Sequence, residues 1–106
     1  MTSDNEKATS VKEFKALLDT IYVIGGKWKV PIIHAICAGR HLRFREIERN
    51  VTGITSRMLA RELKEMEQNK LITRTVYPET PVRIEYDTTE YCITLVPVIQ
   101  SMIDWE

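Results

Sequence analysis

Residues 53–68 decide the fold of this chain, and they read Gly53-Ile54-Thr55-Ser56-Arg57-Met58-Leu59-Ala60-Arg61-Glu62-Leu63-Lys64-Glu65-Met66-Glu67-Gln68. They predict an amphipathic helix with a sharp start, because Gly53 permits a turn and Thr55 is a suitable N-cap. Leu59, Leu63 and Met66 recur at i, i+4 and i+7, which predicts one apolar stripe facing a core.

A second face of this helix carries cations at the same spacing and small residues beside them: Arg57, Arg61 and Lys64, with Ser56 and Ala60. A face of this kind can enter a DNA major groove. The alternative is a solvated surface helix, in which the three glutamates of the same stretch pair with its cations.

The segments around this helix favour a winged helix-turn-helix. Phe44, Ile47 and Val51 bracket a short helix, and residues 50–53 form a tight turn into the central one. After it, Leu71–Tyr77 and Val82–Asp87 have the composition of strands, and two prolines lie in the loop between them. We therefore expect an α+β fold, mainly helical, with a two-stranded β wing.

Terminal helices are expected on both sides of this unit. Residues 1–9 are predicted to be a flexible tail, and residues 10–106 a single domain. A capping box predicts a helix start at Ser10, and a glycine pair ends that helix at residues 25–26. A second helix is expected from Lys27 or Trp28 to Gly39, with Pro31 in its first turn.

The last helix, expected from Thr88 or Thr89 and kinked by Pro97, is apolar on nearly every side. A chain this short cannot surround such a helix, so we expect a homodimer. The predicted interface comes from both terminal helices: Phe14, Leu17, Leu18, Ile21, Ile99, Met102 and Ile103, with Ile99 and Ile103 at its centre.

Composition adds further expectations. The chain of 106 residues has no apolar run long enough for a membrane span and no apolar signal region at its start, and its two cysteines form no motif, so we expect a cytoplasmic protein. The net charge is zero, yet residues 40–83 hold ten cations and six anions, a net charge of +4. The local field around the central helix, rather than the total charge, governs attraction to phosphates.

Several motifs occur in a specific order: Ile24-Gly25-Gly26-Lys27-Trp28, 42–47, 53–59, 63–67, 76–79, 82–86, Thr89-Glu90 and 95–98. Together they resemble the HxlR-type winged helix-turn-helix regulators of bacteria and archaea, over about residues 14–105. The resemblance implies a homodimer that binds operator DNA and represses or activates nearby genes.

The chain departs from that family in two places. Many relatives carry a Cys-Pro pair nine residues before the Ile-Gly-Gly-Lys-Trp motif, and some use this cysteine to sense oxidants, but Lys15 stands here. The usual Thr-Glu-x-Gly reads Thr89-Glu90-Tyr91-Cys92, which affects packing at the start of the last helix. Cys92 has no base or cation beside it in the sequence, although a redox role stays open.

Other side chains have two interpretations. Arg43 and Arg45 begin the short helix and are expected to contact phosphate, whereas Arg83 either enters a minor groove or pairs with Glu79 or Glu85. Trp28 and Trp105 are interpreted as packing residues. His34 and Cys37 are one turn apart but lack further ligands, so no metal is expected, and Cys37 is interpreted as a small buried hydrophobe.

We find no catalytic motif and expect no cofactor. The sequence thus predicts a DNA-binding transcription regulator that acts as a homodimer on an inverted-repeat operator. Its DNA-contact residues are expected to be Arg43, Arg45, Thr55, Ser56, Arg57, Ala60, Arg61, Lys64 and Arg83. The alternatives are a winged-helix protein–protein module and a sensor that binds an unknown small-molecule effector.

Overall fold

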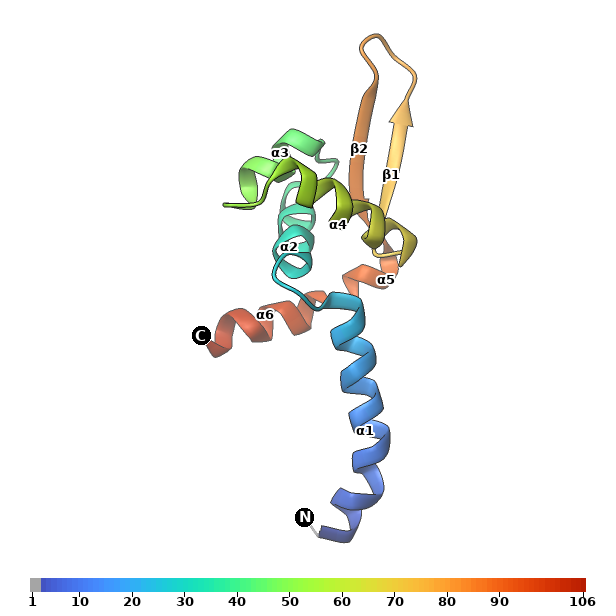
Figure 1. Cartoon of the computed structure of the whole chain (residues 1–106), viewed down its shortest axis with the longest axis vertical. Coiled ribbons are helices and arrows are strands. Elements are labelled where there is room, and N and C mark those ends of the chain that lie inside the picture. The colour runs from blue at the N-terminus through green and yellow to red at the C-terminus, as the bar shows by residue number, and fades with distance from the viewer. Residues whose placement is uncertain (1–2) are drawn as a thin grey trace.

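The structure, a computed structural model, describes residues 3–106, with side chains from residue 10 onwards. Figure 1 shows a small body of helices, an upright hairpin, and two terminal helices that project from the body. In chain order the elements are α1 (Ser3–Ile24), α2 (Lys29–Gly39), α3 (Phe44–Asn50), α4 (Ser56–Gln68), β1 (Ile72–Tyr77), β2 (Arg83–Thr88), α5 (Glu90–Ile93) and α6 (Val96–Trp105).

The body is built around α2, α3 and α4, which share one hydrophobic core. The stripe of Leu59, Leu63 and Met66 is buried there, as its spacing predicts. α2 contributes Ile32, Ile33 and Ile36 to this core. Ile47 of α3 and Val51, which follows α3, are buried in it as well. Helical periodicity therefore fixes which side of α4 faces inward and leaves its other side to solvent.

The hairpin is the predicted wing. β1 and β2 pair antiparallel from Ile72↔Thr88 to Tyr77↔Arg83, each strand beginning one residue later than expected. Leu42 exchanges two backbone hydrogen bonds with Tyr86, Leu42 N to Tyr86 O at 3.1 Å and Tyr86 N to Leu42 O at 2.8 Å. This bridge attaches the segment before α3 to β2, so the wing is fixed to the helix-turn-helix.

The last helix does not kink at Pro97 but breaks before it, which corrects the prediction of one continuous element. α5 ends at Ile93 and α6 begins at Val96, with Pro97 in its first turn. In a continuous helix the Pro97 ring would clash with the carbonyl of Ile93, four residues earlier. Tighter turns replace that geometry, with Thr94 N bonded to Tyr91 O and Leu95 N to Cys92 O.

The first helix also differs from its prediction, since α1 begins at Ser3 rather than Ser10. Glu6, Lys7 and Ala8 all favour helix, which explains an earlier start. The tail predicted for residues 1–9 stays a prediction, and residues 1–2 lie outside the described part. None of the described helices is both long and apolar enough to cross a bilayer.

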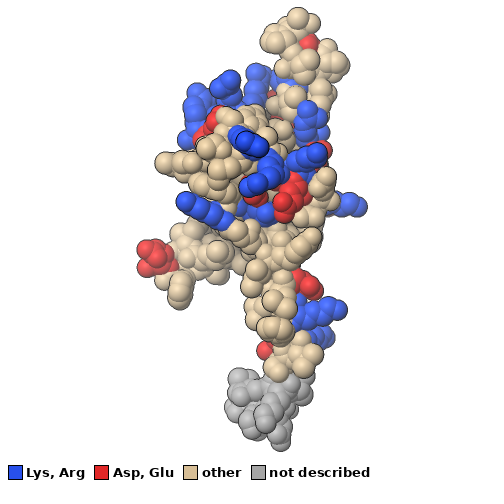
Figure 2. Space-filling view, in the orientation of Figure 1, with Lys and Arg blue, Asp and Glu red and all other residues tan. Residues whose placement is uncertain are grey.

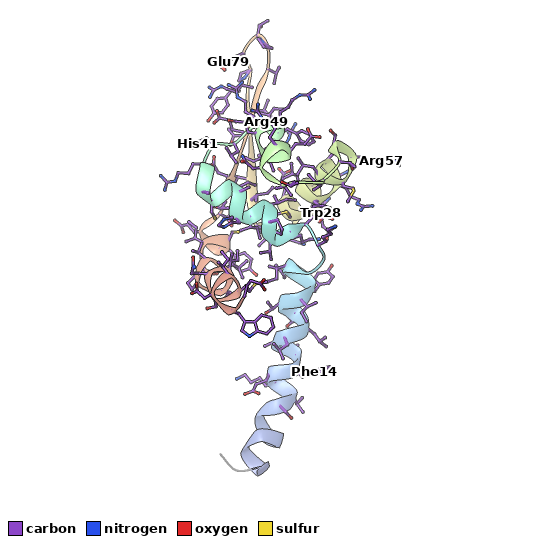
Figure 3. The ribbon with its side chains drawn as sticks, turned by 90° about the vertical axis from the view of Figure 1, so that its left-hand side faces the viewer. Phe14, Trp28, His41, Arg49, Arg57 and Glu79 are labelled. Carbon is purple, nitrogen blue, oxygen red and sulfur yellow. The ribbon has the colours of Figure 1, made fainter. Side chains whose placement is uncertain are left out.

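The terminal helices carry most of the exposed apolar surface. Phe14 and the predicted interface residues after it on α1 are 49–62% exposed, and α1 extends far from the body (Figures 1 and 3). Met102 and Ile103 of α6 are about half exposed. Ile99 is only 6% exposed because it packs into the core of its own chain, so it is not free to form the centre of an interface.

The two tryptophans, Trp28 and Trp105, differ in how far they are exposed to solvent. Trp28 packs against the core, as expected, whereas Trp105 is 90% exposed at the end of α6, so the packing interpretation is wrong for Trp105 within a single chain. The chain measures 63 × 27 × 22 Å, and this elongated shape leaves Phe14 on α1 and Trp105 on α6 without cover from the body.

Candidate nucleic-acid interface

The N-terminus of α4 is held by hydrogen bonds on both sides of its first turn. Gly53 has φ +91°, so the predicted turn needs a residue without a side chain there. The Thr55 hydroxyl accepts a hydrogen bond from Met58 N at 3.1 Å, which confirms it as the N-cap. The Ser56 hydroxyl donates to Glu48 of α3, so α3 and α4 are linked at the turn.

The exposed side of α4 carries the predicted cationic face. Arg57, Arg61 and Lys64 are all exposed, with Ser56 and Ala60 exposed beside them. In Figure 3, Arg57 projects away from the body of the protein. Across residues 10–106, none of these three cations forms an ion pair. Their charge is therefore available to an external anion.

Lys29 pairs with two of the three glutamates of α4, Glu62 and Glu65, and so keeps them from the cationic face. Glu65 is four residues after Arg61, a spacing that favours an ion pair on a helix. Instead Lys29 Nζ lies 2.9 Å from Glu62 Oε1 and 3.1 Å from Glu65 Oε1. The interpretation of α4 as a self-neutralised surface helix is therefore wrong for these two glutamates.

Lys29 is itself unusual, since only 7% of it is exposed at the first position of α2. Burial alone lowers the pKa of this lysine, but its hydrogen bonds to Glu62 and Glu65 outweigh that effect, and its pKa is raised above 10.5. Lys29 is thus charged at neutral pH. It connects α2 to the inner edge of α4 and so fixes the orientation of the cationic face.

The wing presents no free cation at Arg83. Arg83 Nε lies 2.7 Å from Glu79 Oε2, Arg83 Nη1 lies 2.7 Å from Glu85 Oε2, and the guanidinium carbon lies 3.8 Å from the centre of the Tyr77 ring. Hydrogen bonds to Glu79 and Glu85 raise the pKa of Arg83. The salt-bridge interpretation is confirmed, so insertion of Arg83 into a minor groove would require both ion pairs to break.

Exposed arginines lie instead along α3. Arg43 and Arg45, expected from the sequence, are exposed at its beginning, and Arg49 is exposed in its last turn. Figure 2 shows Lys and Arg side chains gathered over the part of the body where α3 and α4 lie, while the tip of the hairpin is largely free of them. Arg49 is a further exposed cation that the predicted contact residues do not include, although its position four residues after Arg45 places both on one side of α3.

The two thiols differ in environment. Cys92 is fully buried, and burial, with a smaller contribution from Cys37, raises the pKa of its thiol to about 11. Cys37 is half-buried rather than buried, and its thiol lies 3.8 Å from the Thr88 hydroxyl. His34 is exposed, and no group of three or more ligating side chains suited to a metal occurs among the described residues.

Comparisons with known proteins agree with this geometry. An uncharacterized HTH-type transcriptional regulator of Halalkalibacterium halodurans is 37% identical over 86 residues, covering 81% of this chain and 76% of that protein. One of Methanothermobacter thermautotrophicus is 45% identical over 82 residues, covering 77% of this chain but only 62% of that protein.

The solved structure of the redox regulator HypR in its oxidized form matches with a TM-score of 0.79 and 38% identity, covering 85% of this chain and 92% of that one. The sequence profile of the HxlR-like helix-turn-helix family matches residues 23–106, which include the helix-turn-helix, the wing and α6. This protein therefore belongs to the HxlR-like helix-turn-helix family.

Proposed function

We propose that this protein regulates transcription by binding double-stranded DNA in the cytoplasm, with α4 as the recognition helix in the major groove. The observation that carries the proposal is the unpaired cationic face of Arg57, Arg61 and Lys64. Lys29 holds Glu62 and Glu65, two of the three glutamates of α4, so this face stays net positive toward DNA. Arginine can bind guanine through two hydrogen bonds, and lysine more often contacts phosphate.

The proposal includes a symmetric homodimer. α1 and α6 expose large apolar side chains, and soluble proteins rarely leave such surface uncovered. Contact between these helices from two subunits around a two-fold axis would remove that surface from water. The same axis would place two α4 helices about 34 Å apart, or at a multiple of that distance, so the operator is expected to be an inverted repeat.

The test is a salt-dependent mobility-shift assay with fragments selected from the host genome. Arg57→Ala or Arg61→Ala is expected to weaken operator binding by about 1–3 kcal/mol if the side chain reads a base. Lys64→Ala is expected to weaken specific and non-specific binding alike if it contacts phosphate. Absence of DNA binding by the parent would favour a protein–protein module.

Unchanged binding by a folded Arg57→Ala, Arg61→Ala double variant would remove α4 from the interface while leaving the protein a DNA binder. The fold of the variant is checked by circular dichroism. Both side chains are exposed and form no ion pair, so the substitutions are expected to leave the core intact.

A further inference from the structure

Two consecutive residues between α2 and α3, Arg40 and His41, have an unusual backbone conformation. Arg40 has φ +56° and His41 has φ +51°, so both lie in the left-handed region. A Cβ atom makes this region unfavourable, and a strained residue persists only where surrounding contacts hold it. Such residues are concentrated at sites where function needs a fixed geometry. The bend at residues 40–41 is therefore a candidate for a functional role.

Asp87 of β2 supplies the contacts that hold this bend. Its Oδ1 accepts a hydrogen bond from His41 N at 2.7 Å, and its Oδ2 lies 2.8 Å from His41 Nδ1. Figure 3 shows His41 between the end of α2 and the hairpin. One carboxylate thus holds both the backbone and the ring of His41.

The bend is attached to one face of the wing. Side chains alternate along a strand, so Glu85 and Asp87 lie on the same face of β2. Glu85 Oε1 lies 3.9 Å from His41 Nδ1, and beside it Leu42 and Tyr86 exchange their two backbone hydrogen bonds. Three consecutive residues of β2 therefore contact two consecutive residues of the segment between α2 and α3.

The other face of the wing lies toward α4. Arg74 of β1 pairs with Tyr86 in the sheet, and both line a groove of about 320 Å³ with Lys64 and Glu67 of α4. Arg74 and Lys64 are exposed, and neither forms an ion pair with any residue from 10 to 106. The separation of these two cations depends on the angle at which the wing leaves the body, and the contacts of β2 with residues 41–42 help to set that angle.

We propose that Asp87 is a positioning residue for DNA binding, which holds the bend at residues 40–41 and so fixes the angle between the wing and α4. The inference rests on the proposed function. A duplex can contact both elements only if their cations match the spacing of its phosphates, and phosphate contacts fix the register of a protein on DNA. As an acidic residue Asp87 would itself repel phosphates, so its effect on binding is exerted through His41.

The experiment measures binding to a random-sequence DNA duplex of about 30 base pairs by fluorescence anisotropy, as a function of salt. The variant is Asp87→Ala. If the released wing loses one phosphate contact in each subunit, the dimer loses about 1.8 units of slope, which is about 60-fold weaker binding at about 0.1 M salt against a reference of about 1 M. Removal of an acidic residue would by itself strengthen binding to DNA, so the expected effect is opposite in sign to a charge effect.

Two further variants serve as controls. Asp19→Ala removes the same type of side chain from α1, where Asp19 is exposed and has no ion pair among the described residues, and it is expected not to weaken binding. Asp87→Asn keeps an oxygen that can accept the hydrogen bond from His41 N, so it is expected to retain most of the binding.

A third comparison separates positioning from stability, with His41→Gly as the background. Glycine adopts positive φ without strain, so the bend then depends less on Asp87 for its stability. In this background Asp87→Ala is expected to lower the melting temperature much less than it does in the parent. It is still expected to weaken DNA binding, because the wing is no longer held.

The outcomes are distinct. If the parent does not bind the duplex, the proposed function fails, and the role of Asp87 in binding fails with it. If the parent binds and Asp87→Ala binds as tightly or more tightly, DNA binding stands and Asp87 is not a positioning residue. If the His41→Gly background restores stability and DNA binding together, Asp87 contributes to stability alone, which also overturns the assignment. Equal weakening by Asp19→Ala, or an Asp87→Asn protein as weak as Asp87→Ala, would overturn it as well.

Discussion

The ion pairs of Lys29 with Glu62 and Glu65, here called the Lys29 clamp, lead to a quantitative prediction about the stability of the fold. Lys29→Met removes the ammonium group and keeps a long apolar side chain in the same space. The substitution leaves Glu62, whose side chain is 13% exposed, without its partner at 2.9 Å. Glu65 loses a partner at 3.1 Å as well, but its side chain is 49% exposed and water can replace that contact.

The expected cost follows from these exposures. Loss of a charged hydrogen bond with one mostly buried partner costs about 1.5–3 kcal/mol, and the exposed pair adds at most about 0.5 kcal/mol. A total of about 1.5–3.5 kcal/mol is a large share of the roughly 5–15 kcal/mol that stabilises a small protein. At about 4 °C per kcal/mol, the melting temperature should fall by about 6–14 °C.

The assay is urea unfolding followed by circular dichroism, at one protein concentration because a dimer's stability depends on it. Lys64→Met is the matched control: Lys64 is exposed on α4 and unpaired, and a change below about 0.5 kcal/mol is expected. Lys29→Met combined with Glu62→Gln should recover about half the loss, since the only carboxylate then left without Lys29 is the half-exposed Glu65, which water can solvate. A Lys29→Met protein as stable as the parent, or a double variant with no recovery, would refute the clamp.

The pH dependence of the clamp has a defined sign. The folded pKa of Lys29 is raised above its ordinary value of 10.5, so the stabilisation is fully present below that pH. It is lost as the pH rises above 10.5 and through the folded pKa. Lys29→Arg stays charged in this range and is therefore expected to lose less stability than the parent as the pH rises above 10.5.

Two further predictions concern assembly and redox chemistry. Ile103→Asp is expected to give a monomer in light scattering at micromolar concentration, because it would bury an unpaired charge between α1 and α6 of two subunits. A parent protein that is itself a stable monomer and still binds one inverted repeat tightly would contradict the predicted dimer. Mild peroxide is expected to leave DNA binding largely intact, because Lys15 replaces the family cysteine and burial raises the pKa of Cys92 to about 11. Mass spectrometry after alkylation at pH 8 should show Cys37 modified before Cys92, and reductant-reversible loss of binding that Cys92→Ser abolishes would be the opposing result.

The sequence by itself determined the elements that depend on local periodicity. The spacing of Leu59, Leu63 and Met66 places one side of α4 in the core, and Thr55 caps the helix where the sequence predicts it. The wing and the turn at Gly53 also depend on residues close together in the sequence. The two strands of the wing pair across a short loop, and the turn needs the positive φ of Gly53. These interactions span only a few residues, so their pattern can be read along the chain.

Only the tertiary structure decided which charges stay free. Glu65 is placed to pair with Arg61 by helical spacing, yet it contacts Lys29, 36 positions earlier in the chain. Ile99 and Ile103 are equivalent in sequence terms, but the approach of α6 to its own core buries the first and leaves the second exposed. The periodicity of the sequence defines the faces of a helix, but the partner of each face depends on how distant segments pack. That packing leaves Arg57, Arg61 and Lys64 of α4 without ion-pair partners among the described residues.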